Sequence, residues 1–174
     1  LNHYCFYLCN QKFQINMSKG NVTIETNDQG VATVEFFHPM SNSLPGEILS
    51  KLAKTISDAG KNNKIKVIIL KSSGDRTFCA GASFEELSSI SNFEEGKKFF
   101  LGFANVINAA RECPKLIIGR IQGKAVGGGV GMASAVDYCI ATKYASVKLS
   151  PRPDVKTGID AINGRTNQVI GSKI

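Results

Sequence analysis

The 174-residue sequence lacks any stretch close to the roughly 18 to 20 consecutive apolar residues that a membrane-spanning helix needs. It also lacks the basic start and small-residue cleavage pattern of a signal peptide. We therefore expect a protein with no membrane segment and no membrane partner.

Cysteine and histidine are too few and too scattered for a metal centre or a disulfide framework. The five cysteines are an odd number and none belongs to a CxxC pair, and the only two histidines are His3 and His38. The sequence predicts no metal site and a reducing compartment, which we take to be the cytoplasm.

A concentrated basic patch is also missing, although the net charge is +7. Lysines and arginines occur singly or in pairs, usually near acids, whereas nucleic-acid binding needs a basic stripe or a recognised motif. We expect no nucleic-acid partner, only modest basic spots suited to a small polyphosphate ligand.

What the chain does contain is the pattern of one α/β domain. Residues 1–16 are predicted to be an N-terminal extension, 17–150 the core and 151–174 a divergent tail.

The spacing of apolar residues predicts the elements of the core. Apolar and polar residues alternate on both sides of 27–30, which predicts a hairpin. Apolar residues three and four positions apart predict one helix over 45–59, ending at Gly60, and another over 93–112. Apolar runs at 65–70, 116–121 and 138–141 predict parallel strands, the first buried on both faces. The stripe of the second helix places Phe99, Phe100 and Phe103 in the core, with an acyl-chain channel as the alternative role.

Two glycine-containing turns carry the chemistry: FCAGAS at 78–83 and GKAVGGGVG at 123–131. Each follows a strand and precedes a helix, an arrangement that leaves backbone N–H groups directed at an approaching ligand. If the turns lie side by side, one N–H from each can hold a single carbonyl oxygen, as in an oxyanion hole. Tight turns without a ligand remain an alternative, and so does a dinucleotide site, although GGGVG lacks the GxGxxG spacing.

Three segments resemble the crotonase (enoyl-CoA hydratase/isomerase) family: HPMSNSL at 38–44, FCAGASFEEL at 78–87 and the long run CPKLIIGRIQGKAVGGGVGMASAVDYCIAT from residue 113. The resemblance implies a crotonase-like spiral of ββα units, here C-terminally incomplete. It also implies an acyl-CoA thioester as partner, with coenzyme A as part of the substrate and no separate cofactor. Family members commonly form homotrimers or hexamers.

Carried over residue by residue, the resemblance makes the backbone N–H groups of Ala82 and Gly128 the oxyanion donors. The residues expected around the substrate are Phe78, Ala80, Gly81, Gly127 and Gly131. Ser83 stands where the family often has a structural aspartate.

The chain departs from the family at both positions of the catalytic glutamates, which Gly131 and Pro151 occupy. Asp154 is expected to be a loop acid, Glu85 and Glu86 to stabilise a helix N-terminus, and Cys79 to be buried rather than nucleophilic.

For the intact relative we therefore expect an enzyme, a lyase that hydrates α,β-unsaturated acyl-CoA. Methylglutaconyl-CoA hydration or enoyl-CoA isomerisation are alternatives. A noncatalytic CoA-thioester binder or an incomplete gene product is the alternative from another class.

Overall fold

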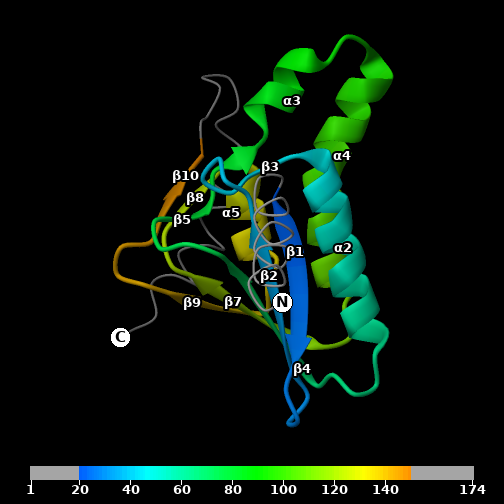
Figure 1. Ribbon diagram of the computed structural model, residues 1–174, viewed down its shortest axis with the longest axis vertical. Helices are drawn as coiled ribbons and strands as arrows, with labels where there is room; N and C mark the ends of the chain where they lie inside the picture. Colours follow the sequence, from blue (N-terminus) through cyan, green and yellow to red (C-terminus); the bar gives the residue numbers. More distant parts are fainter. Residues whose placement is uncertain (1–19, 150–174) are drawn as a thin grey trace, which may run out of the picture.

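The computed structural model describes residues 20–149, which form ten strands and four helices within that range (Figure 1). The strands are β1 (Asn21–Thr26), β2 (Val31–Phe37), β3 (Ser43–Leu44), β4 (Val67–Ser72), β5 (Thr77–Cys79), β6 (Gly81–Ala82), β7 (Leu116–Ile121), β8 (Lys124–Val126), β9 (Tyr138–Ala141) and β10 (Ser146–Lys148). The helices are α2 (Gly46–Lys61), α3 (Phe84–Ser89), α4 (Phe93–Arg111) and α5 (Gly128–Ser134).

The largest sheet has the order β1-β2-β4-β7-β9, in which only β1 and β2 are antiparallel. Each of its parallel strands leads into a short strand of a smaller sheet, β10-β8-β5 or β3-β6. In three successive turns a helix follows before the chain returns to the large sheet. This repeat of strand, strand and helix confirms the predicted α/β spiral.

Helices α2 and α4 run side by side along one side of the large sheet (Figure 1). α2 contributes the buried face Ile48, Leu49, Leu52 and Ile56, spaced by one, three and four residues as on one side of a helix. These side chains pack with Val34 and Phe36 of β2 in one core cluster. Within 20–149, no helix is long and apolar enough to cross a bilayer.

The predicted hairpin is confirmed, with β1 and β2 paired from Asn21–Phe37 to Thr26–Ala32. The side-chain oxygen of Asn27 accepts hydrogen bonds from the backbone N–H groups of Gln29 and Val31. Gly30 takes a φ of 84°, a left-handed conformation that glycine adopts without steric cost.

The expectation that residues 65–70 are buried on both faces is wrong. In β4, residues Ile68, Leu70 and Ser72 are buried, whereas the alternating positions are only half-buried. β7 also alternates, and its outer positions Leu116 and Arg120 are exposed. A short apolar run does not distinguish these cases, because large residues on the outer face of a strand leave the same sequence pattern.

Two helix details also differ from expectation. α2 continues through Gly60 to Lys61 instead of ending there, and a Cβ on Gly60 would lie 2.9 Å from Sγ of Cys113. The glycine therefore serves close packing, not helix termination. In α4, Phe99 is buried but Phe100 is 70% exposed, since consecutive helical residues point about 100° apart.

Candidate functional site

The two glycine-containing turns lie directly against each other. β5 and β8 are paired in parallel, with Thr77 opposite Lys124 and Cys79 opposite Ala125. Past the end of these strands, a Cβ on Gly81 would lie 3.1 Å from the carbonyl oxygen of Val126. The prediction of an oxyanion hole required the two turns to lie side by side. The pairing of β5 with β8 brings them together.

Gly128 is the first residue of α5, so its N–H has no acceptor within its own helix. The preceding residue, Gly127, has a φ of 53° and open space where a Cβ would stand. Its own N–H is occupied, because it donates to the carbonyl oxygen of Lys148 at 3.0 Å. The turn therefore presents the N–H of Gly128 next to an unobstructed backbone surface.

The turn that carries Ala82 is held by residues 42–44. Ala80 N donates to the carbonyl oxygen of Asn42 at 3.2 Å, and Ser83 N donates to that of Leu44 at 3.1 Å. The hydroxyl of Ser43 donates to the carbonyl oxygen of Ala82 at 2.8 Å. The segment HPMSNSL thus fixes the position of the first turn.

Asn42 organises this region from a buried position that sequence inspection did not assign to it. Its Nδ2 donates to the carbonyl oxygens of Ser73 and Thr77 at 2.9 and 3.0 Å, and its Oδ1 accepts from the N–H of His38 at 2.8 Å. Asn42 has a φ of 56°, a conformation that asparagine tolerates better than most residues. One side chain therefore ties together the ends of β2, β4 and β5.

Of the other residues expected near the substrate, Ala80 is half-buried in the first turn and Gly81 is buried with a φ of 98°. The side chain of Phe78 is fully buried and makes an edge-to-face contact with Phe36, at 5.3 Å between ring centroids. The side chain of Phe78 is therefore part of the core. A Cβ on Gly131 would lie 2.9 Å from Cδ1 of Ile107.

The side chains around the first turn have structural roles. Burial raises the pKa of the Cys79 thiol to about 12, so the thiol is protonated at neutral pH. Ser83 caps α3 by accepting from the N–H of Glu86, as an aspartate also would. The carboxylate of Glu86 in turn accepts from the N–H of Gly46 at 2.7 Å, at the first turn of α2. Glu85 is exposed. Both Glu85 and Glu86 lie in the first turn of α3, as expected for acids that stabilise a helix N-terminus, and Glu86 in addition holds the first turn of α2.

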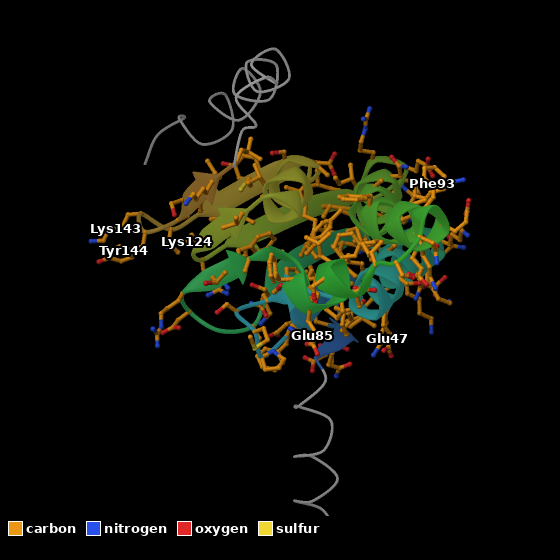
Figure 2. All side chains as sticks on the ribbon, turned by 90° about the horizontal axis from the view of Figure 1, so that it is seen from above. Glu47, Glu85, Phe93, Lys124, Lys143 and Tyr144 are labelled. Carbon is orange, nitrogen blue, oxygen red and sulfur yellow. The ribbon has the colours of Figure 1, made fainter. Side chains whose placement is uncertain are left out.

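A groove of about 780 Å³ lies at the start of β5, at the opposite end of this strand from the turn that carries Ala82, and no sequence pattern indicated it. It lies where β2, β4 and β7 end and where β5 and β8 begin, and its polar lining includes His38, Asp75, Arg76, Lys124 and Tyr144. Lys124, Lys143 and Tyr144 gather at one end of the molecule (Figure 2). Burial lowers the pKa of His38, an effect that nearby Glu85 only partly offsets.

Within the described part of the chain, no three His, Cys, Asp or Glu side chains lie close enough to hold a metal ion. Asp154 and Pro151 lie outside the described residues.

The model of the enoyl-CoA hydratase/isomerase family matches residues 26–170. The chain belongs to this family. Ethylmalonyl-CoA decarboxylase of Xenopus laevis is 27% identical over 159 residues, which cover 85% of this chain and 53% of the relative. Human mitochondrial methylglutaconyl-CoA hydratase is 33% identical over 108 residues, which cover 62% of this chain and 32% of the relative.

Solved structures of enoyl-CoA hydratases share the fold. The enoyl-CoA hydratase of Bacillus anthracis superposes with a TM-score of 0.72 at 23% identity, covering 88% of this chain and 63% of that one. The chain spans about half the length of the curated relatives it matches. Relatives of the chain carry the names of a decarboxylase, a hydrolase and a hydratase of CoA thioesters, so these names share a class of ligand but not a reaction.

Proposed function

We propose that the protein binds an acyl-CoA thioester whose carbonyl oxygen accepts hydrogen bonds from the backbone N–H groups of Ala82 and Gly128. The observation that carries this proposal is the contact between the two turns, at Gly81 with Val126 and at Gly129 with Cys79. Two donors on touching turns can reach one oxygen atom. Family membership supports the thioester as ligand.

Such a site accelerates reactions in which the thioester oxygen gains negative charge. Its hydrogen bonds strengthen as an enolate forms, and the loss of one donor typically costs about 3 to 4 kcal/mol of transition-state stabilisation. Hydration of an α,β-unsaturated acyl-CoA is the leading reaction. Methylglutaconyl-CoA hydration and double-bond isomerisation would use the same polarisation of the carbonyl.

The groove at the start of β5 suits the phosphates of coenzyme A. Arg76 and Lys124 line it, both with exposed side chains, and cationic side chains hold phosphate through charge-assisted hydrogen bonds. Thr77 opens the strand that leads to Ala80, so a ligand in the groove has the oxyanion turn at the other end of β5. We assign the phosphates to this groove and the thioester to the turns.

Decarboxylation of a 2-carboxyacyl-CoA is the second candidate. Ile107 fills the space in front of Gly131, an apolar contact at the point where hydratases of the family carry a glutamate. In decarboxylation the bond between Cα and the carboxylate breaks, its electron pair passes to the thioester oxygen, CO₂ leaves, and water protonates Cα. This route needs no proton transfer by residue 131, and the 27% identical ethylmalonyl-CoA decarboxylase supports it.

The oxyanion hole is tested by ¹³C-difference infrared spectroscopy of bound butyryl-CoA, which has no double bond to hydrate. Gly128→Pro removes the donor. Phe93→Pro is the matched control, because it places a proline at the exposed first residue of another helix, α4, away from the two turns. We expect the carbonyl band to shift to lower frequency in the wild-type chain and in Phe93→Pro, and not in Gly128→Pro. Equal shifts in two folded variants would contradict the assignment.

Parallel assays with crotonyl-CoA and ethylmalonyl-CoA distinguish the two reactions. Formation of 3-hydroxybutyryl-CoA supports hydration, and release of CO₂ with formation of butyryl-CoA supports decarboxylation. Binding of both thioesters without turnover would favour the noncatalytic binder.

A further inference from the structure

Helix α4 packs on α5 at two glycines. A Cβ on Gly128 would lie 2.6 Å from Cγ and Cδ1 of Phe103, and one on Gly131 would lie 2.9 Å from Cδ1 of Ile107. Phe103 and Ile107 are four residues apart, and Gly128 and Gly131 are three apart, so each pair lies on one face of its helix. The glycines allow α4 to approach the first turn of α5 closely.

The ring of Phe103 therefore lies on the residue that would donate to the thioester oxygen. Cγ, Cδ1 and Cδ2 of the ring all come within 2.8 Å of the position that a Cβ of Gly128 would take. Phe103 is only partly buried, with part of its side chain packed against the core.

Phe103 is held firmly by its own helix. The preceding residue, Gly102, lies so close to α2 that a Cβ there would come within 2.9 Å of Cδ1 of Leu49. One turn beyond, Val106 is buried in the core. The backbone that carries Phe103 is thus fixed between α2 and α5.

We infer that Phe103 is a positioning residue of the oxyanion hole: its ring fixes the first peptide of α5 and keeps water away from the N–H of Gly128. The inference rests on the proposed function. A hydrogen bond to a developing oxyanion strengthens when the local dielectric constant falls, and it needs no reorganisation when the donor is already oriented. An apolar ring packed on the donor residue supplies both conditions.

The test measures two properties of Phe103→Ala: the carbonyl shift of bound ¹³C-labelled butyryl-CoA and its dissociation constant. We expect the shift to fall by roughly half or more, because the donor becomes hydrated and mobile. The dissociation constant should rise by only about tenfold or less, since most contacts of a CoA ligand lie elsewhere. A purely structural role of Phe103 would not separate these two readouts.

Phe100→Ala is the matched control, because it removes the same side chain from an exposed position on the same helix. It should leave both readouts unchanged. Phe103→Leu keeps much of the apolar volume and replaces Phe103→Ala in the test if the alanine variant does not fold. Its carbonyl shift should lie between those of the wild type and Phe103→Ala.

An unchanged shift in either folded Phe103 variant overturns the inference and leaves the oxyanion hole in place. Absence of a shift in the wild-type chain with bound butyryl-CoA overturns the oxyanion hole itself, and the inference with it.

Discussion

Gly129 lies directly against Cys79: a Cβ on this glycine would come within 2.7 Å of both Cβ and the carbonyl oxygen of the cysteine. The two residues belong to the two turns that we assign to the thioester oxygen. The spacing of the proposed donors is therefore set by a contact between a buried cysteine and the second residue of α5. This contact leaves no room for a larger residue at position 129.

Gly129→Ala should destabilise the protein by about 1 to 3 kcal/mol, because the new methyl group meets backbone as well as side-chain atoms that cannot move aside. Chemical denaturation followed by circular dichroism measures the change. Gly96→Ala is the control, since its Cβ would meet only Ile90 at an ordinary 3.6 Å. It should be neutral or stabilising by up to about 1 kcal/mol, the difference in helix propensity. Equal effects of the two substitutions would contradict the close contact.

Gly131 and Ile107 should be energetically coupled. Ile107→Val removes Cδ1, the atom nearest to Gly131, and alone should cost about 0.5 to 1.5 kcal/mol. Gly131→Ala should cost less in the Ile107→Val background than in the wild type, with a coupling energy of roughly 0.5 kcal/mol or more. A double-mutant cycle of unfolding free energies tests this, and strict additivity would show that the two residues do not touch.

Asn42→Ala should be among the most damaging single substitutions in the described residues. It removes three hydrogen bonds and leaves the carbonyl group of Ser73 and the N–H of His38 without this partner, at a cost of roughly 2 to 4 kcal/mol. The carbonyl group of Thr77 keeps its longer hydrogen bonds from Ser72 and Gln122. Asn108→Ala, exposed on α4, is the control and should stay within about 0.5 kcal/mol of wild type. A small loss of unfolding free energy in Asn42→Ala would mean that water molecules replace the hydrogen bonds of the Asn42 side chain.

Glu35 should make the fold sensitive to acid. Burial raises the pKa of Glu35, but hydrogen bonds from Lys71 and Ser73 and the charges of Lys71 and Arg120 outweigh it, so the pKa is lowered. The carboxylate lies 2.6 Å from Nζ of Lys71 and 2.6 Å from the hydroxyl of Ser73. A lowered pKa means that the unfolded chain takes up the proton first.

The stability contributed by Glu35 should therefore be present above the unfolded pKa of about 4.3 and be lost as the pH falls through the folded pKa. Glu35→Gln should flatten this acid limb in thermal melts recorded across the range. Glu25→Gln, exposed in β1, is the control. An acid limb that is identical in wild type and Glu35→Gln would remove Glu35 from this role.

Local sequence patterns predicted most of the fold. The strands at 116–121 and 138–141 were predicted with their actual bounds, and the hairpin followed from Asn27 and Gly30. These features depend on neighbouring residues. The exposure of Phe100 and the continuation of α2 through Gly60 were mispredicted because both depend on what packs against the helix.

The sequence predicted the two backbone turns of the candidate site but not the side chains that pack around them. The two turns are visible as glycine motifs, but the contacts of Gly128 with Phe103 and of Gly131 with Ile107 join residues more than twenty positions apart. The role of Asn42 likewise depends on partners 31 and 35 residues away. Nothing in a single sequence encodes such distances directly.

Helix α3 has six residues and none of them is buried. So short a helix has little stability of its own, and it is attached largely through Glu86, whose carboxylate holds Gly46 of α2. Amide protons of α3 should therefore exchange with solvent through local opening, well before those of α2. Because α3 starts two residues after Ala82, each opening would loosen one side of the thioester site while the remainder of the fold stays intact.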